Sequence, residues 1–314
     1  MPRVSVVIPA FNASWCIRDA LDSVGRQTYK DYEVIVVNDG SVDSTHDAVL
    51  EWLEGAKPFP GRLIDQENRR LGGARNTGTR HASGEYVAFL DADDVWYPEK
   101  LARVVGAFDD SKPATALVCH DEVVTRDGKI VRINRYGPWV PDMYRFLLFE
   151  GSRLSPSSTV VKRTLLETAG GFSEDPEVHS VEDYDLWLRL SRLTRFHFLG
   201  EILGEYRLYR GSLGSDPEYN LRHCLNVVDR HAAQYFRERP QPTWRDRYGI
   251  RRRRALAFRS ASMAAQARGE YARAALYIAT SLRLCPADYK NWAALAWCGG
   301  QALTHTFPGI YTSS

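Results

Sequence analysis

The stretch Tyr86-Val-Ala-Phe-Leu-Asp91-Ala-Asp93-Asp94 joins a short apolar run to a dense group of acids. The apolar part is typical of a buried strand, so the acids are expected at one edge of a sheet. Carboxylates this close repel one another, and a hard cation such as Mg²⁺ or Mn²⁺, shared with substrate phosphates, would relieve the repulsion. A substrate that carries a diphosphate is therefore the first hypothesis, although acids after a strand also form turns and cap helices.

Strands and helices alternate over the first 90 residues or so. The expected strands are Val4–Ile8, Glu33–Val37, Arg62–Asp65 and Tyr86–Leu90, and helical patterns fall at Ile17–Val24, Ala48–Leu53 and Leu71–Ala82. This alternation predicts an α/β fold in which helices cover both faces of a mostly parallel sheet. Ligands of such sheets bind outside the carboxyl ends of the strands. The strand ends Pro9-Ala10-Phe11-Asn12, Asn38-Asp39-Gly40-Ser41 and Asp91-Ala92-Asp93 are therefore expected to converge on one crevice.

The sheet is expected to change character after a helix that follows Pro98. Asp127-Gly128, a tight-turn dipeptide, separates two apolar runs, which predicts an antiparallel hairpin. Two further short strands are expected, so the whole sheet is predicted to be mixed. The runs concerned are Ala116–Thr125, Lys129–Ile133, Thr159–Lys162 and Phe196–Leu199.

Helix-forming residues dominate beyond about Asp216, which predicts an α/β domain over residues 1–216 and a helical region over residues 217–314. Several small and aromatic residues of this region have the spacing of a tetratricopeptide-like hairpin. They are Gly269, Tyr271, Ala274, Pro286, Trp292 and Leu295. A single helical hairpin is favoured over a peptide-binding array, because such repeats need stacked neighbours to bury their faces.

The composition is that of an ordinary globular protein. The 314 residues suit one large or two modest domains, and 44% of them are hydrophobic. Lys plus Arg (41) nearly balance Asp plus Glu (39), so the charge gives no general case for a nucleic-acid partner. Five scattered cysteines, no signal-peptide pattern and no apolar stretch of about 20 residues favour a cytoplasmic location.

Two further segments carry candidate binding residues. Asp39 could accept hydrogen bonds from a base N–H or a ribose hydroxyl, or it could simply start the following helix. Gly72-Gly73-Ala74-Arg75-Asn76 resembles a phosphate cradle, in which small residues let the backbone approach and Arg75 supplies donors. It matches neither the P-loop nor the dinucleotide fingerprint, so kinase-like and NAD-type functions are poor alternatives.

A second group of acids lies at Glu182-Asp183-Tyr184-Asp185, at the start of an apolar helix. Ser180 and Asp183 have the spacing of a capping box, so these acids could serve only to complement the helix dipole. That role needs one or two of the three acids. Glu182 or Asp183 could instead supply a general base.

Taken together, these motifs resemble a family-2 glycosyltransferase with the GT-A fold. The matching segments occur in the family's order over about two thirds of the chain. They are Val4-Ser-Val-Val-Ile-Pro-Ala-Phe-Asn12, Val36-Val-Asn38-Asp39-Gly40-Ser41, Gly73-Ala-Arg75-Asn76-Thr-Gly78, Asp91-Ala-Asp93-Asp94, Gly170-Gly171-Phe172 and Glu182-Asp183-Tyr184-Asp185.

The resemblance implies an inverting enzyme that moves a sugar from a nucleotide diphosphate, most simply a UDP-sugar, to a hydroxyl of a glycan or lipid-linked acceptor. It implies donor binding by Pro9, Phe11, Asp39, Arg75, Asp91, Ala92 and Asp93. It also implies that Asp93 and Asp91 hold Mg²⁺ or Mn²⁺ and that Asp183 is the catalytic base. Assembly of bacterial-type surface glycans or glycolipids is the expected setting.

One position departs from the family. The family often has Tyr-Arg-x-His after the base helix, whereas this chain has Tyr206-Arg207-Leu208-Tyr209. Because tyrosine replaces the histidine, Arg207 or Arg210 could contact the same negative charge, and a third protein contact to the metal is in doubt.

The helical region is strongly basic over one short window. Nine arginines lie between Arg237 and Arg259 against two acids, including the block Arg251–Arg254. A solvated helix face is the simple explanation. The block could also hold the chain against an anionic membrane at the inner face, at about 1 kcal/mol per residue.

Two alternatives remain open. A sugar nucleotidyltransferase would share nucleotide binding but would need a glycine-rich, basic loop after the first strand, where Pro9-Ala10-Phe11-Asn12 stands. A non-catalytic protein that binds nucleotide sugars and recruits a partner through its helical tail would not need Asp91, Asp93 and Asp183 together.

Overall fold

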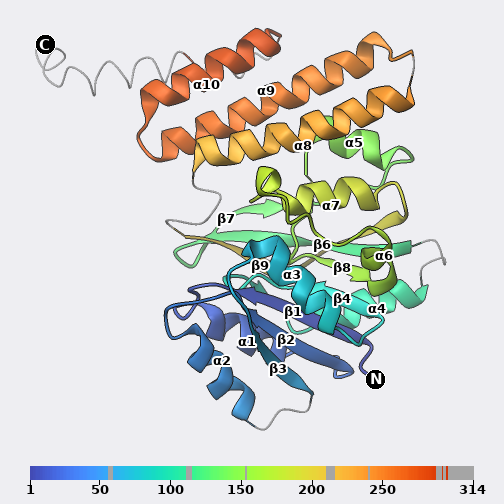
Figure 1. Cartoon of the computed structure of the whole chain (residues 1–314), viewed down its shortest axis with the longest axis vertical. Coiled ribbons are helices and arrows are strands. Elements are labelled where there is room, and N and C mark those ends of the chain that lie inside the picture. Colours follow the sequence, from blue (N-terminus) through green and yellow to red (C-terminus); the bar gives the residue numbers. More distant parts are fainter. Residues whose placement is uncertain are drawn as a thin grey trace, which may run out of the picture. The chain divides into compact units, whose positions relative to one another are not determined.

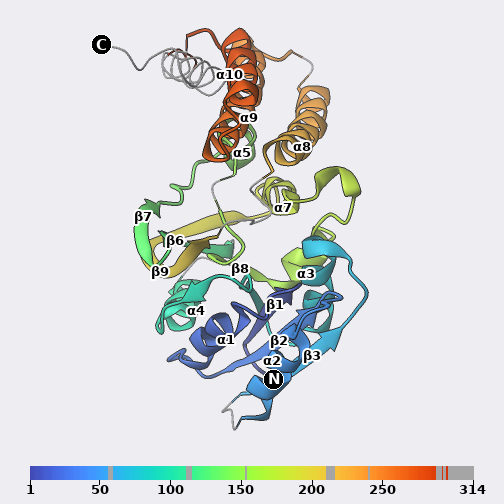
Figure 2. The same cartoon turned by 90° about the vertical axis from the view of Figure 1, so that its left-hand side faces the viewer.

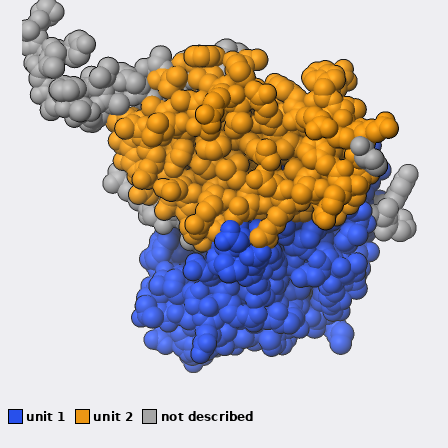
Figure 3. Space-filling model, turned by 45° about the horizontal axis from the view of Figure 1, so that its top comes forward, with its two compact units in different colours: residues 1–144, 152–209 blue, residues 145–151, 210–314 orange. Residues whose placement is uncertain are grey.

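The computed structural model describes residues 1–55, 59–110, 115–152, 154–209, 216–239 and 241–287, together with Trp292 and Leu295. The chain forms two compact units, which Figure 3 shows in different colours. Unit 1 comprises residues 1–144 and 152–209, and unit 2 comprises residues 145–151 and 210–314. Within the described ranges, no helix is both long and apolar enough to cross a bilayer.

A single mixed sheet runs through unit 1 (Figure 1). Its strands are β1 (Val4–Ala10), β2 (Tyr32–Asn38), β3 (Gly61–Asp65), β4 (Tyr86–Phe89), β5 (Val95–Trp96), β6 (Thr115–Arg126), β7 (Lys129–Asn134), β8 (Thr159–Lys162) and β9 (Arg195–Leu208). The strand order is β3-β2-β1-β4-β8-β6-β9-β5, and β7 pairs with β6. Strands β1 to β4 are parallel, and β8 is antiparallel to both of its neighbours. The predicted mixed, mostly parallel α/β fold is confirmed.

Helices cover both faces of this sheet, and β1 and β2 are mostly apolar and are buried along their whole length. Val4, Val6 and Ile8 of β1 belong to one core cluster with apolar residues of α1 (Ile17–Gly25), α2 (Thr45–Glu54) and α4 (Lys100–Asp110). The alternate residue Val7 faces α3 (Arg70–His81), where Gly78 lies against it. Figure 2 shows α1 and α4 on one side of β1 and α3 on the other.

The later strands confirm the hairpin and correct one boundary. Strands β6 and β7 pair antiparallel across Asp127 and Gly128, both of which have positive φ. The strand predicted at Phe196–Leu199 is too short, since β9 continues beside β6 to Leu208. Glycines and glutamates after residue 199 interrupt the apolar pattern, but the backbone goes on pairing through them.

Among the described residues, three smaller helices fall between β7 and β9 along the chain. They are α5 (Met143–Glu150), most of which belongs to unit 2, α6 (Arg163–Thr168) and α7 (Glu182–Leu190). A turn of 3₁₀ helix at Pro176–Val178 precedes α7. Helix α7 buries its apolar side chains, among them Trp187.

The described part of unit 2 contains three long helices that lie side by side in Figure 1. They are α8 (Pro217–Glu238), α9 (Trp244–Ala267) and α10 (Tyr271–Leu284). Helices α9 and α10 form a hairpin in which the hydroxyls of Ser262 and Ser281 donate to the carbonyls of Ala274 and Ala255 at 2.9 and 2.7 Å. The predicted helical C-terminal region is confirmed, whereas most of the next predicted repeat lies outside the described residues.

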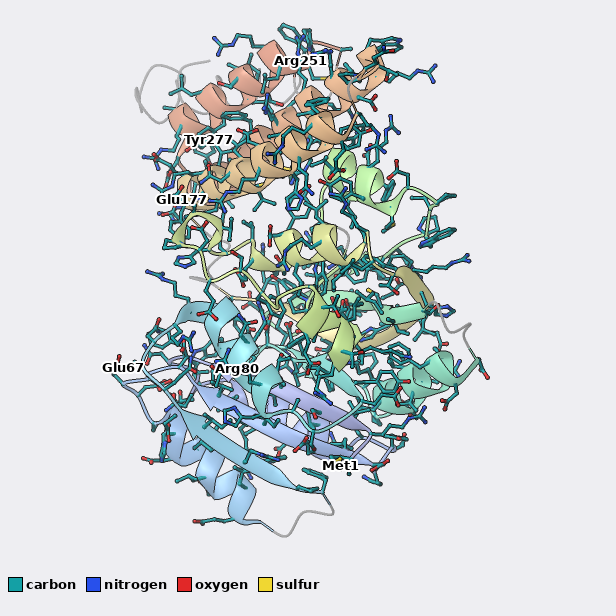
Figure 4. All side chains as sticks on the ribbon, turned by 45° about the vertical axis from the view of Figure 1, so that its right-hand side comes forward. Met1, Glu67, Arg80, Glu177, Arg251 and Tyr277 are labelled. Atoms are coloured by element: carbon teal, nitrogen blue, oxygen red, sulfur yellow. The ribbon has the colours of Figure 1, made fainter. Side chains whose placement is uncertain are left out.

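The arginine block does not form one free cationic face. Arg251, labelled in Figure 4, donates to the carbonyls of Leu284 and Arg283 at the end of α10. The other three also bond within unit 2: Arg252 to Glu150, the buried Arg253 to Cys224 and Arg254 to Asp229. Successive helical residues point about 100° apart, so four consecutive arginines reach different neighbours. The expected contact of Arg251–Arg254 with an anionic membrane stays a prediction.

Candidate active site

Three strand ends meet at one edge of the sheet, as the sequence predicts. Strand β1 lies between β2 and β4, and all three run in the same direction. The amide of Asp39 donates to the carbonyl of Ala10 at 2.8 Å, and the amide of Leu90 donates to that of Val7 at 3.0 Å. The residues that follow these strands therefore start from neighbouring points.

The loop after β1 is fixed to the loop after β2. Asn12, with φ of 49°, donates its amide to the Ser41 hydroxyl and accepts from the Val42 amide through its side chain, both at 2.9 Å. Pro9 is buried within β1, whereas the ring of Phe11 is 51% exposed. An exposed aromatic ring on a fixed loop can stack on a flat ligand.

Asp39 is buried and holds the segment that leads into α3. Its Oδ1 accepts from the Gln66 amide side chain at 2.5 Å and from the Arg69 backbone amide at 2.8 Å. Both bonds use the same oxygen, so Oδ2 of Asp39 takes no hydrogen bond from any described residue. That oxygen is available to a hydroxyl or N–H donor of a ligand.

The three acids after β4 have different environments. Asp94 is buried and accepts from the Ser157 hydroxyl at 2.6 Å and the Arg207 amide at 3.0 Å. Asp91 and Asp93 are partly exposed, and Ala92 between them packs against the core. Asp94 is committed to internal bonds, which leaves Asp91 and Asp93 as the two carboxylates predicted to hold a cation.

Burial and the charge of Asp91 raise the pKa of Asp93 to about 6. A shift in this direction means that the anion lacks full compensation within the protein. In the described residues, no group of three or more His, Cys, Asp or Glu side chains could hold a metal ion. Two carboxylates fit a Mg²⁺ or Mn²⁺ ion whose other ligands are phosphate oxygens and water, which is how such ions commonly bind with nucleotides.

Arg75 is a buried bridge between two acids. Its Nη2 donates to Asp91 at 2.6 Å and its Nη1 donates to Glu182 at 2.7 Å, and the side chain is 2% exposed. Burial by itself would lower the pKa of Arg75, but Asp91 and Glu182 outweigh it and the pKa is raised. Arg75 thus lies next to the predicted donor site, and it connects the end of β4 to the start of α7.

The glycines before Arg75 are not a phosphate cradle. They lie inside α3, and a Cβ on Gly72 would stand 2.7 Å from the carbonyl oxygen of Ser173. Asn76 exchanges hydrogen bonds with the backbone of Phe172 at 2.9 and 2.8 Å. This part of the motif therefore serves close packing of α3 against the Gly171–Ser173 segment, which holds Arg75 in place.

Asp183 is the acid of α7 that fits a base. Val181, and not Ser180, is the N-cap residue of this helix, so the capping-box interpretation of Ser180 and Asp183 is wrong. Glu182 is buried and bound to Arg75. Asp183 is partly exposed, and burial together with the charge of Glu182 raises its pKa to about 7.

Asp183 and the β4 acids share a neighbourhood in unit 1. The charges of Asp91, Asp93 and Asp183 all act on the Tyr206 hydroxyl, and burial and these charges raise its pKa. The charges of Asp91 and Asp183 likewise both help to raise the pKa of Arg75.

The segment that departs from the family pattern lies beside these acids. Arg207 donates to Asp19 at 2.6 Å, and its charge helps to keep Asp93 ionised. Tyr209 contacts Trp15 edge to face, with ring centroids 4.4 Å apart, and both rings are partly exposed. Arg210 lies outside the described residues.

Sequence reasoning missed the bond between Arg75 and Glu182. The two residues are 107 positions apart, and a single sequence gives no sign of such a pairing. The sequence offered only an indirect signal: Arg75 lies in a glycine-rich helical segment, and the start of α7 has one more acid than a helix start needs.

The sheet order and these strand-end acids define an α/β fold of the kind that binds nucleotide sugars. Residues 5–170, more than half of the chain, match the family described as "Glycosyl transferase family 2". The chain belongs to this family.

Two curated relatives and one solved structure illustrate the likeness. An uncharacterized glycosyltransferase of Rickettsia prowazekii is 30% identical over 66% of this chain and 64% of its own length. The UDP-Glc:alpha-D-GlcNAc-diphosphoundecaprenol beta-1,3-glucosyltransferase WfgD of Escherichia coli is 31% identical over 72% of this chain and 85% of its own. The mannosyltransferase PcManGT of Pyrobaculum calidifontis, solved with GDP-Man and Mn²⁺, has a TM-score of 0.59 and 23% identity over 98% of this chain and 88% of that one. The chain thus spans a little under two thirds of the length of the Rickettsia relative.

Proposed function

We propose that this chain is an inverting glycosyltransferase that moves a sugar from a nucleotide-diphosphate donor, a UDP-sugar in the first instance, to an acceptor hydroxyl. The observation that carries the proposal is the pair of salt bridges from buried Arg75 to Asp91 and Glu182. They join the strand end that would face the donor to α7, the helix that carries Asp183 in its first turn.

The donor would lie across the ends of β1, β2 and β4. Pro9 and Phe11 would contact the base, and Asp39 would accept a hydrogen bond from the base or ribose through Oδ2. Asp91, Ala92 and Asp93 would line the diphosphate. Arg75 would act by fixing Asp91, because both ends of its guanidinium are already bound to acids.

Asp93 and Asp91 would hold Mg²⁺ or Mn²⁺. When bound, the cation would neutralise the charge that develops on the departing nucleotide diphosphate. The raised pKa of Asp93 supports this assignment, since an uncompensated acid gains most from a cation.

Asp183 would remove the proton of the acceptor hydroxyl as its oxygen attacks the anomeric carbon. A base with a pKa of about 7 is well matched to neutral pH, because it is partly free to accept a proton and still basic enough to take one. Attack from the face opposite the diphosphate inverts the anomeric centre in one displacement. A double displacement would need a second carboxylate as nucleophile.

The relatives guide the choice of substrates to test. The name of WfgD specifies UDP-Glc and a lipid-linked diphosphate sugar, and PcManGT was solved with GDP-Man. A glycan or lipid-linked acceptor in surface-glycan assembly is therefore the class proposed for this chain.

The test is a thermal-shift panel of UDP-, GDP- and dTDP-sugars, each with Mn²⁺ or with EDTA. A cognate donor stabilises the fold by mass action, so sugars carried by one of the three nucleotides should raise the melting temperature. Removal of Mn²⁺ by EDTA should abolish this shift. Asp93→Asn should lose the Mn²⁺-dependent part. No shift with any nucleotide would overturn the proposal, and a full shift in EDTA would overturn the metal assignment.

A further inference from the structure

We propose that Ser157 and Asp94 are positioning residues that hold the turn between Asp91 and Asp93 in the shape that binds diphosphate. The inference rests on the proposed function. It gives Asp94 a role different from that of Asp91 and Asp93. It also gives a role to Ser157, which lies outside the motifs identified in the sequence.

Ser157 contacts both ends of this turn with one hydroxyl. Its Oγ accepts from the amide of Asp91 at 3.1 Å and donates to Oδ2 of Asp94 at 2.6 Å. Within the turn, the amide of Asp94 donates to the carbonyl of Asp91 at 3.0 Å. The Ser157 hydroxyl therefore closes the turn from the inside.

Ser157 is itself fixed by the core. It is 1% exposed, and its carbonyl accepts from the indole N–H of Trp96 at 2.8 Å. Trp96 is a buried residue of β5, the edge strand that pairs with β9. The hydroxyl therefore has little freedom to move away from the turn.

Asp94 extends the same network to β9. Its second oxygen accepts from the Arg207 amide at 3.0 Å, so the carboxylate is used on both sides by the protein. The two outer acids are thus tied, through Asp94, to the strand that carries Arg207.

Such a network matters because like charges tend to separate. Asp91 and Asp93 repel each other, and a turn without internal bonds would relax until a cation joined them. Holding the turn beforehand removes that cost from ligand binding. Partners behind the ligands of metal sites typically change metal affinity by about 10- to 100-fold when they are removed.

The neighbouring Ser158 offers a matched control. It is also buried, and its hydroxyl donates to the Ser155 carbonyl at 2.9 Å and lies 3.3 Å from the Cys119 sulfur. It contacts none of the three acids. Ser158→Ala therefore removes a buried hydroxyl from the same loop without touching the turn.

The experiment measures the Kd of Mn²⁺ in the presence of UDP, or of the nucleotide that the thermal-shift panel selects, by isothermal titration calorimetry. Ser157→Ala is expected to weaken Mn²⁺ binding by about 10- to 100-fold. Ser158→Ala should keep the wild-type Kd, although urea should unfold both variants at similarly lowered midpoints. Ser157→Cys keeps the packing and a weak donor, so it should bind with intermediate affinity and stands in if Ser157→Ala fails to fold.

Each outcome decides between the ideas. A wild-type Kd in Ser157→Ala, or equal weakening in both alanine variants, would overturn the positioning role and leave the proposed function intact. Failure of the wild-type chain to bind Mn²⁺ with any nucleotide would overturn the proposed function, and the inference with it.

Discussion

Replacing Arg75 by methionine is expected to lower the free energy of unfolding by more than the loss of one surface ion pair would. The guanidinium is 2% exposed and donates to two carboxylates, Asp91 and Glu182, at 2.6 and 2.7 Å. Arg75→Met keeps most of the volume and removes the charge, which leaves two acids facing each other without a counter-ion. Breaking one buried ion pair in this way typically costs about 3–5 kcal/mol.

Arg103 provides the matched control for this prediction. It pairs with Glu201 through two hydrogen bonds of 2.9 and 2.6 Å, but its side chain is 56% exposed. Exposed pairs contribute about 0–1 kcal/mol, so Arg103→Met should change little. The hydrogen bonds of the two arginines have similar lengths, although Arg75 serves two carboxylates and Arg103 serves one, and the two sites differ strongly in burial.

The assay is urea unfolding followed by tryptophan fluorescence, with the free energy of unfolding compared among wild type, Arg75→Met, Arg103→Met and Arg75→Lys. Arg75→Lys should be intermediate, because one ammonium cannot reproduce the fork of donors that serves two acids. Equal losses in Arg75→Met and Arg103→Met would refute the argument from burial, and a fully stable Arg75→Lys would refute the argument from the fork.

Two further predictions follow from other contacts. Gly72→Ala should lower the free energy of unfolding in urea by about 1–3 kcal/mol, because its Cβ would stand 2.7 Å from the Ser173 carbonyl oxygen. Gly106→Ala in α4 is the control and should not lose stability, because a Cβ there would have nothing within 4 Å. Equal losses in the two variants would contradict the close-packing role of Gly72. The value of kcat/KM for sugar transfer should rise as the pH increases through about 7, because Asp183 must be deprotonated to act as a base and its pKa is raised to about 7. A value of kcat/KM that does not change over that pH range would contradict the role of Asp183 as base.

The parallel arrangement of the first four strands could be predicted from the sequence because the pattern there is local. Apolar runs and helical spacing determine each element, and the right-handed crossover rule then brings the ends of β1, β2 and β4 to one edge. The Asp127-Gly128 hairpin is local in the same sense. Only Phe196–Leu199 of the 14-residue strand β9 was predicted, because glycines and glutamates after residue 199 hide the apolar pattern.

The partners of the site residues could not be predicted, because they are long-range. Arg75 meets Glu182 across 107 positions and Asp94 meets Arg207 across 113, and neither pair shares a motif. The glycines of α3 suggested an anion cradle because their packing neighbours at Ser173 are likewise far along the chain. The arginine block Arg251–Arg254 suggested a free surface for a related reason. The sequence gives the total charge of the block, but it does not give the acids and carbonyls to which each arginine is hydrogen-bonded.

The most direct test of the central claim is the transfer rate of Asp183→Asn with a cognate donor, measured together with its affinity for that donor and Mn²⁺. The substitution keeps size and removes the basic oxygen, so the donor should bind as in the wild type while transfer falls by about 10²–10⁴-fold. A variant that binds the donor and still transfers sugar at the wild-type rate would contradict the account.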